Sequence, residues 1–261
     1  MSRFIDKLNH VSLAVSQPLG FRTAQSISEK PRMQLIASLA QVEVNSLADS
    51  LAGADAGLLR ISKPGSGAKT LQKMCRAVPD IPWGGWLGEV DSGGIKELVK
   101  AGGDFVVFSA ANTPLAMLQD DEVGKVLEVE TSLSEGLLRA INELPVDAVL
   151  IAGQQEKGYS LTWHHLMLFQ HLANSITKPL LVSIPSSITA DELQVLWEVG
   201  VNGVVIEAEA EQAGERLAAI RQKIDKLTMP AIRDGGKMQA LLPYIGGEAE
   251  ADVAAEDDEE F

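Results

Sequence analysis

Short apolar runs and longer segments with helical spacing alternate eight times along this chain of 261 residues. The apolar runs are rich in Val, Ile and Leu on both faces, which is typical of buried parallel strands. The longer segments repeat apolar residues every three or four positions, and this predicts helices with one buried stripe, such as that of Leu133, Leu137, Ile141 and Leu144. Eight such units require a parallel sheet covered by helices. The predicted strands are 34–39, 56–62, 83–89, 104–110, 124–130, 147–153, 179–184 and 203–208.

The even spacing of these strands favours an α/β fold closed into a compact (βα)8 TIM barrel over residues 34–228. An open sheet is the weaker interpretation, because no GxGxxG fingerprint follows the first strand. We expect residues 1–33 to form an N-terminal extension that covers the floor of the barrel. Residues 229–247 are expected to form a helical extension, and the low-complexity residues 248–261 a disordered acidic tail.

The formal net charge of −14 is unevenly spread, because the segment 248–261 carries eight acidic residues and no basic one. Without it the remaining chain carries only −6. A chain this acidic is a poor partner for nucleic acid, which is bound by clustered Lys and Arg. No stretch approaches the roughly 18–20 apolar residues of a membrane helix. We therefore expect a soluble protein that binds a small molecule and has neither nucleic acid nor membrane as a partner; a homo-oligomer stays open.

The chain has a single cysteine, Cys75, so no intramolecular disulfide can form and a reducing, cytoplasmic location is expected. A reactive thiol needs a neighbour that stabilises the thiolate, such as a His or a helix N-terminus, whereas Cys75 lies mid-way in the stretch KTLQKMCRAV, which has helical spacing. We expect it to have a buried, structural role.

The junctions that lead into several predicted strands, AGGDFVVF, VDAVLI and VGVNGVVI, resemble those of the phosphate-binding (βα)8 barrels. That superfamily includes barrels of tryptophan biosynthesis and thiamine-phosphate chemistry. The resemblance is clearest over residues 178–206, which look like strand seven, helix seven and strand eight of those enzymes. It implies a ligand site at the carboxyl ends of the strands.

The turns that hold phosphate in those barrels are replaced in this chain. The barrels use a Gly-Gly turn after strand seven and a Gly-Ser turn after strand eight, whose N–H groups face the anion. The corresponding segments here are Pro185-Ser186-Ser187 and Glu207-Ala208-Glu209. Carboxylates at this place repel phosphate, so no phosphate site is expected. Ser186 and Ser187, at the predicted start of a helix, can still accept a small anion.

Polar residues near the ends of the predicted strands are candidates for the barrel mouth. In the second strand Leu59 and Ile61 share the face that meets the helices, so Arg60 points inward. The same alternation directs these polar residues inward: Arg60, Ser62, Glu89, Glu128, Glu130, Ser183 and Glu207. The predicted mouth is thus one arginine among several carboxylates.

This cluster has two interpretations. It can be a structural plug in which Arg60 pairs with Glu128 or Glu89. It can instead be a site in which neighbouring carboxylates act as general acid and base or bind a divalent cation. Histidines give no support for a metal, because no HxH or HExxH spacing occurs. His164 and His165 either face the mouth or simply pack, and Trp83 and Trp86 either fill the core or form an aromatic wall.

We therefore expect a lyase or isomerase that acts by acid/base chemistry on a small polar metabolite. Glu128 and Glu89 are the acid/base candidates, and Arg60 is the substrate anchor. No metal ligand is assigned, and the cofactor stays open. The alternative is a non-catalytic barrel that has lost its phosphate site and acts as a binding or scaffolding protein. The further substrate-binding candidates are Ser62, Lys63, Ser183, Ser186, Ser187 and Glu207.

Overall fold

A computed structural model describes residues 2–15, 32–39, 51–62, 64–88, 94–115, 122–152, 160–208 and 213–228. The chain divides into two compact units, Met1–Ala231 and Ile232–Phe261, and every described residue belongs to the first. The helical extension and the acidic tail predicted for 229–261 therefore lie outside the described residues.

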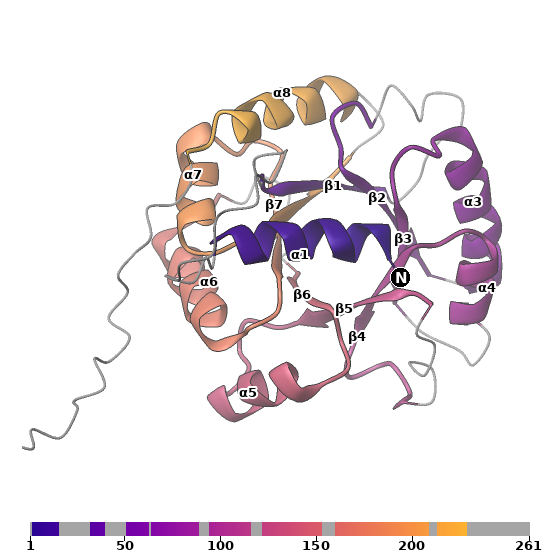
Figure 1. The fold of residues 1–261 in the computed structure, drawn as a ribbon, viewed down its shortest axis with the longest axis horizontal. Helices are drawn as coiled ribbons and strands as arrows, with labels where there is room; N and C mark the ends of the chain where they lie inside the picture. Colours follow the sequence, from indigo (N-terminus) through magenta and orange to yellow (C-terminus); the bar gives the residue numbers. More distant parts are fainter. Residues whose placement is uncertain are drawn as a thin grey trace, which may run out of the picture. The chain divides into compact units, whose positions relative to one another are not determined.

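Eight parallel strands close into a barrel in chain order, which confirms the predicted (βα)8 fold (Figure 1). The last strand pairs with the first, and Glu207 lies opposite Ser38 where they meet. Each strand begins within one residue of its predicted start. The strands are β1 (Gln34–Leu39), β2 (Ala56–Ile61), β3 (Trp83–Leu87), β4 (Phe105–Ser109), β5 (Gly124–Val129), β6 (Ala148–Ile151), β7 (Leu180–Ile184) and β8 (Gly203–Glu207).

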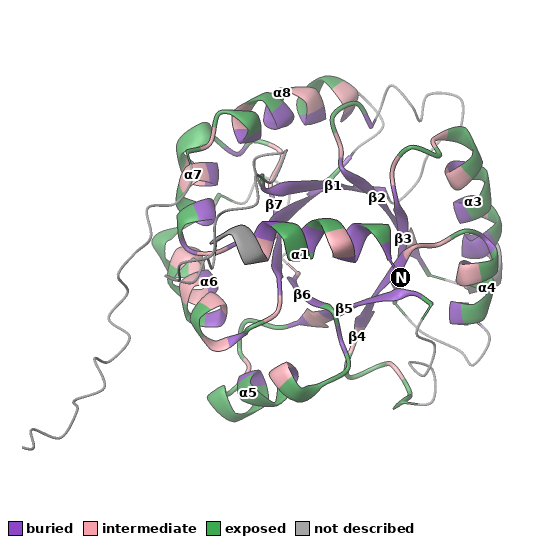
Figure 2. Cartoon of the chain, in the orientation of Figure 1, coloured by how far each residue is buried: buried purple, intermediate pink, exposed green. Residues whose placement is uncertain are grey.

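Helices surround this barrel, and their exposed sides face away from the buried strands (Figure 2). The described helices are α1 (Arg3–Val15), α3 (Pro64–Ala77), α4 (Gly94–Lys100), α5 (Glu135–Glu143), α6 (Trp163–Ser175), α7 (Ala190–Glu198) and α8 (Ala213–Asp225). The predicted stripe on α5 is wrong in two positions, because Leu137 is 55% exposed and the C-cap residue Leu144 is 43% exposed, while Leu138 and Ile141 are buried. Since α5 spans only nine residues, its narrow contact face accommodates one of the two adjacent leucines.

The apolar core has two layers separated by the barrel wall. Leu59, Ile61 and Leu127 belong to the outer layer between sheet and helices, whereas Leu58 and Val126 belong to the barrel interior. This is the alternation predicted from the sequence, and it leaves the intervening Arg60 and Glu128 directed inward.

Trp83 belongs to the outer layer and fills the core, as the first interpretation of this residue predicts. Its side chain is 1% exposed, and its indole nitrogen donates to the Val78 carbonyl at 2.9 Å. The ring lies over Gly57, where an added Cβ would come within 2.5 Å of it. A glycine is therefore required on the neighbouring strand for this ring to lie flat on the sheet.

Helix α1 lies across the amino-terminal ends of the strands (Figure 1). Phe4 and Leu8 are fully buried in the interior layer, and the Phe4 ring stacks on Phe105 with 4.3 Å between centroids. Asp104, which directly precedes β4, holds the start of this helix. Its carboxylate accepts hydrogen bonds from the Arg3 and Phe4 backbone N–H groups, both at 2.9 Å, and from the Ser2 hydroxyl at 2.7 Å.

Replacing Asp104 with alanine should lower the free energy of unfolding by about 1–3 kcal/mol, because α1 loses its N-terminal acceptor. Asp104→Asn should cost less, since an amide oxygen still accepts part of these bonds. Urea denaturation followed by circular dichroism measures the change. Asp80→Ala, which removes an exposed aspartate, is the matched control; an equal loss in both variants would contradict a capping role.

Asp55, just before β2, ties the barrel to α8. Its Oδ2 accepts the Leu35 backbone N–H at 2.8 Å and the Arg221 Nη1 at 2.7 Å. The two side chains are only 9% and 10% exposed. Arg221 also donates through Nε to the half-exposed Asp225 at 3.0 Å. This buried, hydrogen-bonded ion pair fixes the last helix of the barrel to its first two strands.

Candidate functional site

A chain of four side chains spans the barrel mouth, and we call Glu207, Arg60, Trp86 and Glu128 the mouth cluster. Arg60 Nη2 lies 2.9 Å from Glu207 Oε1. The Arg60 guanidinium carbon lies 4.3 Å from the centre of the Trp86 ring, a cation–π contact. The Trp86 indole nitrogen donates to Glu128 Oε2 at 2.8 Å. These residues come from β8, β2, β3 and β5, so the cluster joins opposite sides of the barrel.

The ion pair of Arg60 differs from the one proposed from the sequence, since its partner is Glu207 and not Glu128. Trp86 is the physical reason: its ring stacks on the guanidinium while its N–H engages Glu128, so the indole lies between the two charges. Glu89, the other expected partner, lies outside the described residues. Trp86 is 8% exposed and belongs to the interior layer of the core, as the core-filling interpretation predicts, while it also contacts Arg60 and Glu128. The aromatic wall for a ligand ring stays a prediction.

Three polar atoms of the mouth are buried without a hydrogen-bond partner in the described part of the chain. They are Arg60 Nε, Arg60 Nη2 and Ser38 Oγ. Nη2 is near Glu207, but the contact lacks hydrogen-bond geometry. A buried unsatisfied donor costs about 1–3 kcal/mol. Among the described residues, Arg60 Nε and Ser38 Oγ therefore have unused hydrogen-bonding capacity, while Arg60 Nη2 has only its ion pair with Glu207.

Among the described residues, one of the two Glu128 carboxylate oxygens has a hydrogen-bond partner. The Trp86 indole holds Oε2, while Oε1 accepts no hydrogen bond from the described residues. The side chain is half-buried, and Ser109 lies opposite it in the register of β4 and β5. A carboxylate that is oriented by one donor and free at its second oxygen can accept or deliver a proton.

The remaining candidates are spread around the mouth. Ser183 is half-buried and on the inward face of β7, whereas Ser62 is exposed just past the end of β2. Lys63 lies outside the described residues. Glu130 lies past the end of β5 and is exposed, and its carboxylate accepts a hydrogen bond from the Ser132 hydroxyl at 3.3 Å. The structure therefore brings Arg60, Glu128, Ser183 and Glu207 to one end of the barrel, but it does not bring Ser62 or Glu130 inside.

Ser186 and Ser187 do not begin the helix that follows β7. They lie in a turn closed by the Ile188 N–H and the Pro185 carbonyl, and α7 starts later with Thr189 as its N-cap. Thr189 accepts the Glu192 N–H, and the Glu192 carboxylate accepts the Thr189 N–H at 2.8 Å. Because this capping box fills the helix end with an acidic side chain, an incoming anion meets repulsion there.

His165 also caps a helix. Its Nδ1 accepts the Thr162 backbone N–H at 3.1 Å at the start of α6, while His164 is exposed. This favours the structural interpretation of His165. Among the described residues, no group of three or more His, Cys, Asp or Glu side chains is arranged to hold a metal ion.

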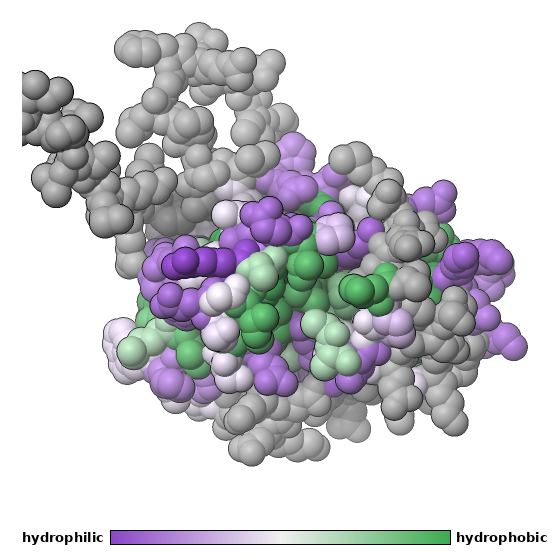
Figure 3. All heavy atoms as spheres, turned by 90° about the horizontal axis from the view of Figure 1, so that it is seen from below, coloured by the Kyte–Doolittle hydropathy of each residue, from purple (hydrophilic) through white to green (hydrophobic). Residues whose placement is uncertain are grey.

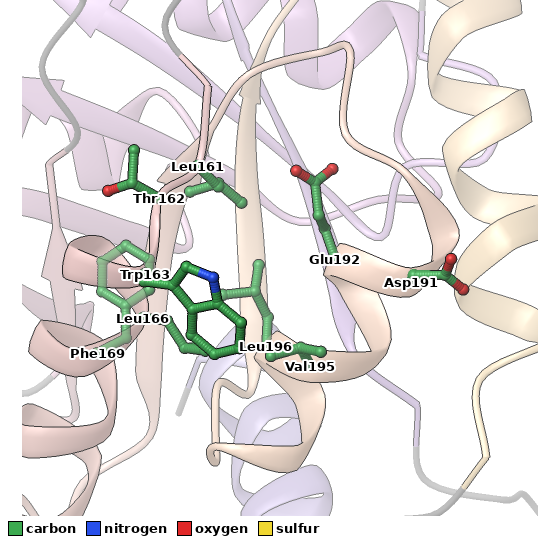
Figure 4. A pocket seen from close by; sticks show the side chains of 9 residues that line it. All are labelled: Leu161, Thr162, Trp163, Leu166, Phe169, Asp191, Glu192, Val195 and Leu196. Carbon is green, nitrogen blue, oxygen red and sulfur yellow. The ribbon is translucent and has the colours of Figure 1, made fainter.

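A separate apolar groove of about 490 Å³ lies between α6 and α7 on the outside of the barrel (Figure 4). Trp163 is 82% exposed at its edge, and Val195 faces it from the neighbouring helix. Figure 3 shows apolar side chains gathered between hydrophilic ones on the face turned to the viewer.

Among the described helices, none is both long and apolar enough to cross a membrane.

Cys75 is half-buried on α3, and its Sγ lies 3.5 Å from the Gly102 carbonyl oxygen. Burial raises the pKa of its thiol above the ordinary value of 9.0. We expect native protein to react with iodoacetamide at pH 8 at least about tenfold more slowly than urea-unfolded protein.

The raised thiol pKa also sets a direction for stability against pH. Folding favours the neutral thiol, so this contribution is complete below the pKa of the unfolded chain and is lost as the pH rises through the higher pKa of the folded protein. Cys75→Ser removes this contribution, and urea denaturation at pH 7 and pH 10 measures it. An equal loss of stability with rising pH in wild type and variant would contradict the assignment.

The closed barrel with its mouth cluster places the chain among the (βα)8 barrels. No protein-family model matches the sequence, and no curated protein matches it. Solved structures do match over most of this chain. KGPDC from Streptococcus mutans has a TM-score of 0.59 at 13% identity and covers 75% of this chain and 98% of its own.

Two further solved structures match at similar levels. Orotidine 5'-phosphate decarboxylase from Pyrococcus horikoshii OT3 has a TM-score of 0.57 at 14% identity, covering 74% of this chain and 100% of its own. A mutant tryptophan synthase alpha-subunit from Pyrococcus furiosus has a TM-score of 0.55 at 14% identity, covering 75% and 98%. The resemblance to phosphate-binding (βα)8 barrels is thus confirmed at the level of the fold.

Sequence reasoning missed Ser38 as a mouth residue. The signal was present, because Leu35 and Leu39 in the run QLIASL mark the outer face and Ser38 alternates with them. A serine in an otherwise apolar strand is easily interpreted as a small residue that only fills space in the core. Its importance comes from Arg60 and Glu207, which meet from the two strands beside it.

Proposed function

We propose that this protein is a lyase or isomerase that acts by acid/base chemistry on a small polar metabolite at the barrel mouth. Glu128 is the acid/base residue and Arg60 the substrate anchor; Glu89 is retained as a second acid/base candidate. The observation that carries the proposal is the position of the Glu128 carboxylate. One of its oxygens accepts a hydrogen bond from the Trp86 indole, and the face of the same indole contacts the Arg60 guanidinium.

The chemistry that fits this arrangement is removal of a proton from a carbon next to a carbonyl group. The free Oε1 of Glu128 takes the proton, and the electron pair moves into the carbonyl to give an enolate oxygen. Arg60 offsets the negative charge of the bound molecule. Returning the proton at another position gives isomerisation, and expulsion of a leaving group from the enolate gives a lyase reaction.

Proton exchange with solvent tests the proposal, because it follows the first chemical step whichever reaction comes after that step. The protein is incubated in D₂O with 2-oxo acids, 2-hydroxy acids and neutral aldoses, and the loss of C–H signals is followed by proton NMR. We expect at least one compound to exchange faster with wild type than with Glu128→Gln. Exchange at the uncatalysed rate for every compound, or equal rates in the two proteins, would contradict the proposal.

The alternative function, a binding or scaffolding barrel, is supported by the α6–α7 groove. Trp163 lines the groove and is 82% exposed, and Met167 on the same helix is 68% exposed. Large exposed apolar side chains that lie together often mark a surface that binds another protein. In that case the mouth cluster is a structural plug. A Trp163→Ser variant that loses a bound partner while proton exchange at the mouth is absent would favour this alternative.

A further inference from the structure

We infer that the substrate of the barrel mouth is a carboxylic acid, and that its carboxylate displaces Glu207 from Arg60 and binds with help from Ser38. This inference rests on the proposed function, whose site it shares. It adds the chemical class of the substrate, one new binding residue and a role for Glu207.

The donor pattern of Arg60 is the first support. Nε and Nη2 form one edge of the guanidinium, and two parallel N–H groups on such an edge match the two oxygens of a carboxylate. Both atoms are buried, and neither has a hydrogen-bond partner among the described residues. Among the described residues, only the Glu207 carboxylate approaches this edge, at Nη2 and without hydrogen-bond geometry, so the edge can take up a planar anion that bonds to both N–H groups.

Ser38 is the second, independent support. Ser38 is only 2% exposed, and its Oγ has no hydrogen-bond partner in the described part of the chain. Strand β1 lies between β2 and β8, so the contact of Arg60 with Glu207 crosses the strand that carries Ser38. The Ala208 N–H donates to the Ser38 carbonyl at 2.8 Å, which holds Glu207 beside this serine. The hydroxyl is thus a third donor close to the guanidinium.

Glu207 occupies the charge position that the substrate would take. Its carboxylate neutralises Arg60 at 2.9 Å but makes no hydrogen bond to the buried edge. The side chain is 48% exposed, so it can turn into solvent without a large desolvation cost. A substrate carboxylate that satisfies both N–H groups and Ser38 therefore replaces a weaker internal contact with stronger hydrogen bonds.

The charges of the mouth favour a monoanionic carboxylate over a phosphate. Only Arg60 among the described cluster residues is cationic, while Glu128 and Glu207 are acidic. The start of α7, which could have held a phosphate, is occupied by its own capping carboxylate. A phosphate dianion would meet greater repulsion at each of these positions than a carboxylate.

Isothermal titration with pyruvate, and separately with inorganic phosphate, at constant ionic strength tests the inference. We expect Glu207→Gln to bind pyruvate about tenfold more tightly than wild type, because a neutral amide competes poorly for Arg60. Arg60→Lys should bind about tenfold more weakly, since lysine lacks the two-point edge, and Ser38→Ala about fivefold more weakly. Glu143→Gln, which removes an exposed charge on α5, is the control and should match wild type.

Two results would overturn the inference: equal pyruvate affinity in Glu207→Gln and Glu143→Gln, or tighter binding of phosphate than of pyruvate by wild type. Circular dichroism confirms that each variant is folded, and Ser38→Ala is the mildest change if Arg60→Lys fails to fold. The failures are separable. Tight pyruvate binding without proton exchange on any acid contradicts the proposed catalysis alone, whereas exchange only on neutral aldoses contradicts the carboxylate site alone.

Discussion

Replacing Asp55 with alanine should lower the free energy of unfolding by about 3–5 kcal/mol, the largest loss expected from a single substitution in the barrel. Arg221, whose side chain is only 10% exposed, would lose its buried partner at 2.7 Å and keep only the half-exposed Asp225 at 3.0 Å to balance its charge. The Leu35 N–H would lose its acceptor as well. Because these contacts join β1, β2 and α8, closure of the barrel is affected directly.

Urea denaturation of Asp55→Ala and Asp225→Ala measures this effect. Asp225 also contacts Arg221, but it is half-exposed, so its removal should cost about 1 kcal/mol or less. The double variant Asp55→Leu with Arg221→Met should recover much of the stability, because no unpaired charge stays buried. A loss in Asp55→Ala no greater than in Asp225→Ala would show that the buried pair is not what fixes α8.

Glu128→Gln should reduce proton exchange on the substrate by about 10²–10⁴-fold, the usual contribution of a general base. Glutamine has nearly the same shape, and its amide oxygen can still accept the Trp86 N–H that Glu128 accepts at 2.8 Å. The substitution therefore removes the base with little change to the mouth. Binding of pyruvate by this variant should change much less than its exchange rate, which separates a catalytic role from a structural one.

The matched control for this prediction is Glu143→Gln, which should retain the wild-type exchange rate. Arg60→Lys should chiefly raise KM, because Arg60 anchors the substrate and does not carry the proton. If Glu128→Gln loses affinity and exchange by the same factor, Glu128 binds the substrate but is not its base.

The fold was predictable because each strand is buried on both faces. Eight such runs leave few alternatives to a helix-covered parallel sheet, and alternation within β2 and β5 correctly directed Arg60 and Glu128 inward. The error on α5 arose because Leu137 and Leu138 are adjacent, and the contact face of a short helix decides between them. Local periodicity alone could not make that choice.

The pairing within the mouth was less predictable, because it depends on how long side chains cross the barrel. The sequence indicated that Arg60 shares an interior with several carboxylates. It did not indicate that the Trp86 ring would lie between Arg60 and Glu128 and leave Glu207 as the charge partner. The start of α7 was likewise placed too early, because Ser186, Ser187 and Thr189 are all suitable N-cap types. Only the capping box with Glu192 selects Thr189.

The central claim is that ligand binds at the mouth cluster, and the indole N–H signals of ¹⁵N-labelled tryptophan test it most directly. Trp86 reports on the mouth through its bond to Glu128, Trp163 reports on the α6–α7 groove, and buried Trp83 is an internal reference. Single Trp→Phe variants assign the signals. On titration with pyruvate we expect the Trp86 signal to shift while those of Trp163 and Trp83 stay in place. A shift of Trp163 with an unchanged Trp86 would contradict the claim and assign binding to the groove.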